Sequence, residues 1–239
     1  MTALEAAEAS GTELVDLAET PLRELNRRLH TLATAGGPRH WRVSNPDGAH
    51  AVACGLDVEA DVAIEGHVGY YCAGMNQLAA VRVHGNAGTG LAENMMSGTV
   101  VVDGNASQSA GATGRGGLLV VHGDAAARCG ISMKGIDIVV RGSIGHMGAF
   151  MAQRGRLVVC GDVGDALGDS IYESHLYVRG EVASLGADCV EKELRDYHLE
   201  ELSRLLRAAG LDDVSPTEFR RYGSARNLYN FKVDNAGAY

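Results

Sequence analysis

The sequence repeats itself every 19 residues. Seven times a glycine follows a run rich in valine, and consecutive copies of this glycine are 19 positions apart with no insertion between them. We call them the register glycines: Gly66, Gly85, Gly104, Gly123, Gly142, Gly161 and Gly180. A unit of this length is too short for a helix–turn–helix repeat or a propeller blade, and it suits one coil of a parallel β-helix.

Apolar residues recur at fixed offsets from each register glycine. The positions four before, two before and two after it hold Val, Ile, Leu or Ala in every copy, and the positions directly beside it are mostly polar. Alternation of this kind is typical of a strand with one buried face. The apolar columns should therefore point into the solenoid, and the columns beside the glycine should point outward.

Two further columns contain only small residues. The position three after the register glycine holds Gly, Ser or Ala, and the position seven after it holds Gly or Ala. Small residues at fixed offsets mark corners, where successive layers approach closely. At the usual inter-strand spacing, seven coils make a rod of roughly 34 Å. We expect right-handed coils, because the competing left-handed form needs a six-residue period.

The stretch RGSIGHMG, Arg141 to Gly148, resembles a nucleotide-binding loop at first sight. The dinucleotide fingerprint is GxGxxG and opens a helix, whereas the spacing here is GxxGxxG. In the repeat, Gly142 is a register glycine and Gly145 belongs to a small corner column. The stretch is therefore the fifth coil, and no phosphate site is expected there.

The two flanks should cap the solenoid, which would otherwise end in open sheet edges. We divide the chain into an N-terminal helix and lead-in (1–49), the β-helix (50–195) and a C-terminal helical cap with a tail (196–239). The first helix should begin at Thr20 as N-cap with Pro21 at its first position. The last helix should begin at Asp196, and a short helix should follow Pro216. The fold class is thus all-β, a single-stranded right-handed parallel β-helix with flanking helices.

Most of the aromatic residues outside the repeat lie in the last stretch of the chain, together with arginines. One interpretation is a tail that folds back over the solenoid; the other is an arm that docks a partner, since Tyr, Phe and Arg are favoured at interfaces. The candidate docking residues are Arg220, Arg221, Tyr222, Arg226, Tyr229 and Phe231.

Composition excludes several classes of function. The net charge of −9 disfavours nucleic-acid binding, which needs a basic face. No apolar run is long enough to cross a membrane, and the N-terminus lacks a signal pattern, so we expect a cytoplasmic protein. The five cysteines form no CxxC pair, which leaves them as reduced, buried thiols.

No catalytic, cofactor-binding or metal-binding residue is predicted on this chain. His84 and His122 share a column but lie two coils apart, and Asp162 with Glu181 is the one adjacent acidic pair in its column. A solvated polar ladder explains these residues better than a calcium site does. His146 follows a corner glycine and is expected at the surface. Motifs that join a nucleophile to its base are missing.

The repeats GHVG, GNAG, GSIG and GDVG resemble the glutamate synthase C-terminal domain, and the resemblance covers roughly residues 50 to 195. The flanks TPLRELNRRLH, GADCVEKEL and FRRYGSARNLYNFKVDNAGAY are similar to the stand-alone β-helix chain of N-methylglutamate synthase. A related repeat occurs in the β-helix component of formylmethanofuran dehydrogenase and of the formyltransferase/hydrolase complex.

The resemblance implies a structural subunit without an active site of its own. Its expected partners are a glutamine-amidotransferase-like chain and an FMN-binding, glutamate-synthase-like chain with an iron–sulfur cluster. The complex would convert methylamine and glutamate to N-methylglutamate and ammonia. The alternatives are the equivalent β-helix component of a formyltransferase/hydrolase complex and, more distantly, an independent polysaccharide-active β-helix enzyme.

Overall fold

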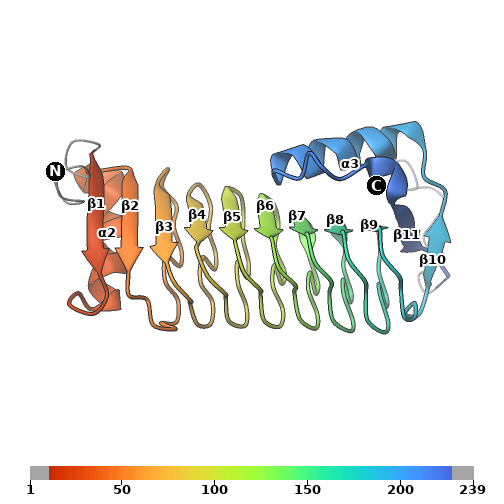
Figure 1. Ribbon diagram of the computed structural model, residues 1–239, viewed down its shortest axis with the longest axis horizontal. Helices are drawn as coiled ribbons and strands as arrows, with labels where there is room; N and C mark the ends of the chain where they lie inside the picture. Colours follow the sequence, from red (N-terminus) through yellow and green to blue (C-terminus); the bar gives the residue numbers. More distant parts are fainter. Residues whose placement is uncertain (1–10, 228–239) are drawn as a thin grey trace.

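One long sheet runs through the whole molecule (Figure 1). The computed structural model describes residues 11–227, and its eleven strands have the order β1-β2-β3-β4-β5-β6-β7-β8-β9-β11-β10. The strands of the repeat follow one another in parallel: β3 (Asp61–Glu65), β4 (Ala80–Val83), β5 (Thr99–Val102), β6 (Leu118–Val121), β7 (Lys134–Val140), β8 (Arg154–Val159) and β9 (His175–Val178). The prediction of an all-β parallel β-helix with flanking helices is confirmed; its right-handed sense stays a prediction.

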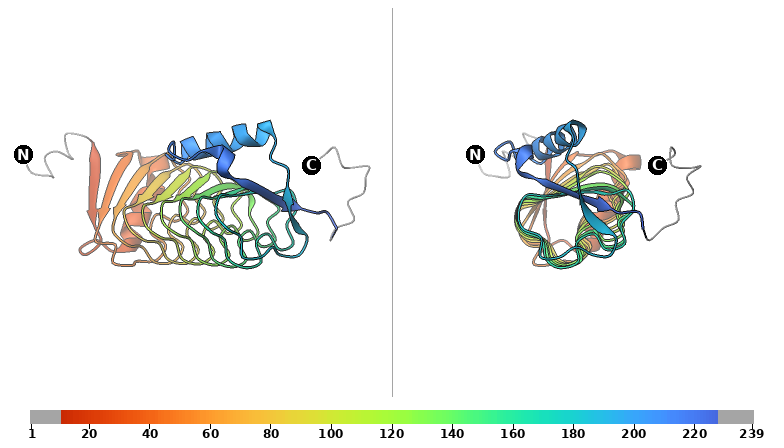
Figure 2. Two further views of the ribbon diagram at one scale, coloured as in Figure 1. Left: turned by 45° about the vertical axis from the view of Figure 1, so that its right-hand side comes forward. Right: turned by 90° about the vertical axis from the view of Figure 1, so that its right-hand side faces the viewer.

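Residues 19 positions apart lie side by side in the sheet. Val81 pairs with Val100, and Val100 pairs with Leu119. The residues two after each register glycine form a second line of parallel bridges, from Val68–Ala87 to Val163–Val182. The end-on view in Figure 2 shows the coils superimposed on one another. The inward columns are buried as predicted, apart from Val182 on the last coil, which is half-buried.

The small column seven after the register glycine contains left-handed backbone in the first six coils. Ala73, Ala92 and Ala149 have φ of 51°, 54° and 55°, and the glycines Gly111 and Gly130 have φ of 69° and 70°. A left-handed conformation disfavours any residue with a Cβ, and most of all a bulky or branched one. The corner therefore selects small residues through backbone conformation as well as through space.

The register glycines stack so closely that a side chain would not fit between them. The N–H of Gly123 donates to the carbonyl oxygen of Gly104 at 3.0 Å, and a Cβ on Gly123 would lie 2.2 Å from Asn105 Oδ1. That oxygen is held there because it accepts a hydrogen bond of 2.8 Å from the backbone N–H of Asp124. The side chain of the polar residue after each glycine thus accepts a hydrogen bond from the backbone of the next coil. The absence of a side chain on the glycine of that coil leaves room for this bond.

The same capping bond recurs six times and links seven consecutive coils. In each case a backbone N–H donates to the side chain of the residue 19 positions earlier, at 2.7–2.9 Å. The donor and acceptor residues are Asn86 and His67, Asn105 and Asn86, Asp124 and Asn105, Ser143 and Asp124, Asp162 and Ser143, and Glu181 and Asp162. The acidic residues of this column are therefore part of a structural polar ladder.

The N-terminal flank adds two coil-like strands and one helix. β1 (Thr12–Asp16) and β2 (His40–Ser44) extend the parallel sheet, and α2 (Leu22–Ala35) packs Leu25 and Leu29 into the core with no exposed surface. The helix begins one residue later than predicted. Its N-cap is Pro21, because the ψ of this residue is 137° and therefore not helical; Pro21 has no side-chain cap.

The C-terminal flank closes the other end with antiparallel strands. β10 (Cys189–Lys192) leads into α3 (Asp196–Ala208), followed by a single 3₁₀ turn η1 (Pro216–Glu218) and β11 (Arg220–Ser224). The expected helix after Pro216 is wrong beyond this turn. β11 instead inserts between β9 and β10, where its backbone pairs with both strands. Pairing an open sheet edge outweighs local helical preference.

Helix α3 covers part of the outer face of the sheet (Figure 1). The column three before each register glycine points outward, and it changes from Arg82 on β4 to apolar residues on β6 to β9. Those residues pack against Leu202, Leu205 and Leu206 of the helix; they are Val120, Val139, Val158 and Tyr177. Cys160 lies in a column that was expected to face outward. It is buried because it packs in the same apolar cluster between the sheet and α3.

Candidate functional site

The predicted docking residues divide between the core, the surface and the undescribed tail. Tyr222 in β11 is 3% exposed and packs into the end of the solenoid core, where it closes the last coil. Its side chain is therefore not available to a partner in this structure. Tyr229 and Phe231 lie outside the described residues.

The three arginines of this set bind back onto the chain. Arg220 donates to the carbonyl oxygen of Gly180 at 2.9 Å, Arg221 donates to the carbonyl oxygen of Glu193 at 3.4 Å, and Arg226 forms two bonds of 2.9 Å with Glu173. These contacts fit the interpretation of a segment folded over the solenoid end, up to the last described residue.

A polar cluster joins α3 to the sheet. Glu201 accepts hydrogen bonds from Tyr177 at 2.7 Å and from Arg156 at 2.7 Å, and its other contact is with His175 at 2.9 Å. Burial opposes the charge on Glu201, but these three bonds outweigh it and hold the pKa of the carboxyl well below its usual range. Arg156 also lies 3.4 Å from Asp137. Sequence reasoning missed this cluster, because its members come from separate coils and from the helix.

The cluster lacks the geometry of a hydrolytic triad. Ser174 precedes His175 in the sequence, and His175 contacts Glu201, so the residue types would suffice. The Ser174 hydroxyl, however, has no hydrogen-bond partner among the described residues and is not bonded to the imidazole. The bonds of Glu201 therefore hold the helix on the sheet, and the serine takes no part in them.

The five thiols are free, and all but that of Cys54 are buried. Burial raises the pKa of Cys72, Cys129 and Cys189 to about 12 and that of Cys160 to about 11. Thiols of this kind are protonated at neutral pH and behave as small apolar side chains.

Among residues 11–227, no group of three or more His, Cys, Asp or Glu side chains could hold a metal ion. Within the same residues, no helix has both the length and the apolar character needed to cross a bilayer.

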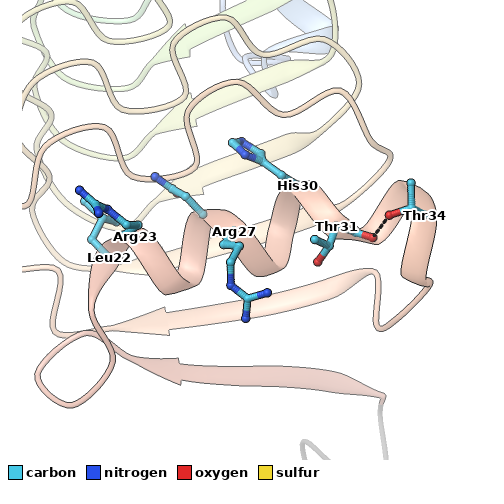
Figure 3. A pocket seen from close by; sticks show the side chains of 7 residues that line it. Leu22, Arg23, Arg27, His30, Thr31 and Thr34 are labelled. Atoms are coloured by element: carbon cyan, nitrogen blue, oxygen red, sulfur yellow. Dashed lines mark hydrogen bonds between the residues drawn. The ribbon is translucent and has the colours of Figure 1, made fainter.

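A hollow of about 570 Å³ lies along α2 (Figure 3). All of its lining residues come from this one helix, so its walls do not converge on a ligand. Asn26 and His30 are occupied at its edge: the Asn26 amide donates to the Ala51 carbonyl at 2.9 Å, and His30 Nε2 lies 2.8 Å from the Cys54 carbonyl. These bonds fasten the helix to the lead-in loop.

A second hollow, about 330 Å³, lies at the C-terminal end of the solenoid. Its walls come from the loop before β9, from β10, from the start of α3 and from β11. Four separate segments thus converge on it, and no single motif in the sequence marks it.

An exposed apolar corner lies on the first coil. Tyr70, Tyr71 and Met75 are 51%, 48% and 52% exposed, and the two tyrosine rings meet edge to face with centroids 6.4 Å apart. We call these three residues the Tyr70 corner. In later coils the equivalent positions carry mostly small or polar side chains. Comparing the coils position by position could have revealed this group in the sequence.

Comparison with curated proteins finds a relative that matches nearly the whole length of this chain. Protein GlxC of Rhizobium meliloti (strain 1021) is 64% identical over 226 residues, which are 95% of this chain and 99% of that protein. No family model matches the chain, and no solved structure matches it.

Proposed function

Since this chain belongs to the GlxC family, we propose that it is a non-catalytic scaffold subunit of a glutamate-synthase-like, flavin-dependent complex. The proposed complex is N-methylglutamate synthase, which would convert methylamine and glutamate to N-methylglutamate and ammonia. FMN and the iron–sulfur cluster would be bound by one partner chain, and a glutamine-amidotransferase-like chain would be the other partner.

The filled solenoid interior is the observation that carries this proposal. The column two before each register glycine is fully buried from the first coil to the last; examples are Ile64, Val102, Val140 and Val178. Along the described coils, a rod whose axis is filled in this way is rigid. It suits a spacer that holds other chains at fixed positions.

Several of the ionisable groups on the sheet are already used in structural contacts. Glu201 is bonded to three side chains, and the carboxylates and amides beside the register glycines cap neighbouring coils. This use of the ionisable groups supports a structural role.

The Tyr70 corner supports association with another chain. Large apolar side chains that gather on the surface of a protein mark protein–protein contacts. Its exposed tyrosines are also among the residues enriched at interface centres.

Purification of the native complex through a tag on this chain tests the proposal. We expect an FMN-containing chain and an amidotransferase-like chain to co-elute in fixed ratio. The purified complex should show a flavin absorption spectrum and should form N-methylglutamate from methylamine and glutamate. Co-elution with a metal-dependent hydrolase chain would instead assign this protein to a formyltransferase/hydrolase complex. A chain that elutes alone under all conditions overturns both assignments.

Two matched variants examine the Tyr70 corner within that experiment. Met75 and Met151 occupy the same position in the first and fifth coils, both are about half exposed, and both have positive φ. Asn94 occupies that position in the second coil, so asparagine fits the backbone there. Met75→Asn should weaken co-elution, whereas Met151→Asn should leave it unchanged.

A further inference from the structure

The hollow at the C-terminal end of the solenoid is lined mainly by cationic and hydrogen-bonding side chains. Lys192 comes from β10, Arg195 and His198 from the start of α3, Arg221 from β11, and Ser174 from the loop before β9. In a chain whose net charge is −9, a hollow with this lining is a local exception.

Three residues of this lining each have a buried polar atom without a hydrogen-bond partner among the described residues. These atoms are Ser174 Oγ, His198 Nε2 and Arg221 Nε. Ser174 is 2% exposed and His198 is 1% exposed. Buried polar groups in folded proteins are nearly always bonded, so three open positions in one small region require an explanation.

All three atoms can donate a hydrogen bond. The backbone N–H of Arg195 donates to His198 Nδ1 at 3.0 Å, so Nδ1 is the acceptor of the ring. Burial, together with Arg221 and His175 nearby, lowers the pKa of His198 to about 4, so the ring is neutral at pH 7. In a neutral imidazole whose Nδ1 accepts, Nε2 carries the proton. The serine hydroxyl and the guanidinium Nε–H are donors as well.

The charges in the lining do not cancel. Arg195 is paired with Glu193 at 2.8 Å, and Arg226 is paired with Glu173 at 2.9 Å. Lys192 and Arg221 form no ion pair with a carboxylate within the described part of the chain. A negatively charged acceptor would satisfy these two positive charges and the three unused donors together.

We propose that this hollow is a binding site for a small oxyanion, a carboxylate or phosphate group, held by Arg221 and Lys192 with Ser174 and His198 as neutral donors. Arg221 provides the planar donor group that matches two oxygens, and Lys192 provides a point charge. The start of α3 places the positive end of a thirteen-residue helix at the same hollow. The volume of about 330 Å³ is at the small end of the range for ligand sites. The site is independent of the scaffold role, since it needs no partner chain.

Calorimetric titration of the full chain with inorganic phosphate and, separately, with glutarate tests the site. We expect saturable binding of at least one of them that weakens as salt is added. Saturation by phosphate alone or by glutarate alone identifies which oxyanion the hollow accepts. The ¹⁵N resonance of His198 Nε2 should shift in step with the heat, because its proton gains an acceptor.

Charge-matched variants separate this site from general attraction of anions. Arg221→Gln should weaken binding about tenfold or more, as expected when a charged hydrogen bond is lost. Arg128→Gln removes the same charge from an exposed corner and should leave binding unchanged. If Arg221→Gln does not fold, Lys192→Gln and Ser174→Ala serve in its place. Equal weakening in the Arg128 variant, or no saturable binding of either anion, overturns the proposal.

Discussion

The phenol of Tyr177 donates a hydrogen bond of 2.7 Å to Glu201, across the contact between the last strand of the repeat and helix α3. The ring of Tyr177 is fully buried beneath the helix, while its hydroxyl reaches the polar cluster. One side chain thus joins the apolar and the polar halves of this contact.

Replacing Tyr177 by Phe should destabilise the protein by about 2 kcal/mol, since the partly buried carboxylate of Glu201 loses one of its donors. The measurement is urea unfolding followed by circular dichroism. Tyr197→Phe is the matched control, because Tyr197 is 54% exposed and should change stability little. Equal unfolding midpoints for the two variants would show that the hydroxyl of Tyr177 contributes nothing.

The stability of the protein should fall between pH 6.5 and pH 4 through His198. Burial lowers the pKa of this histidine in the folded chain to about 4 from its ordinary 6.5. The unfolded chain therefore binds the proton first, and the contribution present above pH 6.5 is lost as the pH falls through 4. The shift corresponds to roughly 3 kcal/mol. Unfolding at a series of pH values, with His198 followed by NMR, measures it; titration of His198 near pH 6.5 would contradict the prediction.

Gly123→Ala should destabilise the solenoid by about 1–3 kcal/mol, as overpacking does elsewhere. The added Cβ would lie 2.2 Å from Asn105 Oδ1 and 2.7 Å from the carbonyl oxygen of Gly104, so the capping bond to Asp124 must also shift. Gly223→Ala is the control, because its Cβ would meet Lys192 Cγ at an ordinary 3.5 Å. Thermal unfolding should separate the two; a similar loss in both would disprove the close stacking of the register glycines.

Val139→Thr should cost about 1–3 kcal/mol, because it buries a hydroxyl under α3 without changing the side-chain shape. Val139 has no exposed surface. Val101→Thr is the same substitution in the same column, at a position that the helix covers only in part, and it should cost less. Guanidinium unfolding of the pair gives the difference. A larger loss for Val101 would mean that the helix does not shield this column.

The repeat in the sequence was sufficient to predict the solenoid. A 19-residue period places every strand from β3 to β9, since identical columns must stack. The cover provided by α3 also leaves a signal in the sequence, because the outward column changes from Arg82 to Val120, Val139 and Val158 where the helix lies.

Other parts of the structure had no local signal in the sequence. β11 is a strand because the open edge of β9 needs a partner, although its own residues suggest a helix. The C-terminal hollow forms only when four segments meet, so no spacing between its residues predicts it. Likewise, Arg221 and Tyr222 are neighbours in the sequence, but only the fold shows that one lines a hollow and the other fills the core.

The two ends of the sheet differ in how the edge strand pairs with its neighbour. β1 is a parallel strand at one edge, whereas β10 at the other edge runs antiparallel to its neighbour β11. Because β11 runs against β9 and β10 runs against β11, β10 again has the direction of the parallel strands β1 to β9. The number of repeats sets the length of the solenoid. Each inserted 19-residue unit would lengthen it by about 4.8 Å, and a shorter insertion would not keep the residue columns aligned.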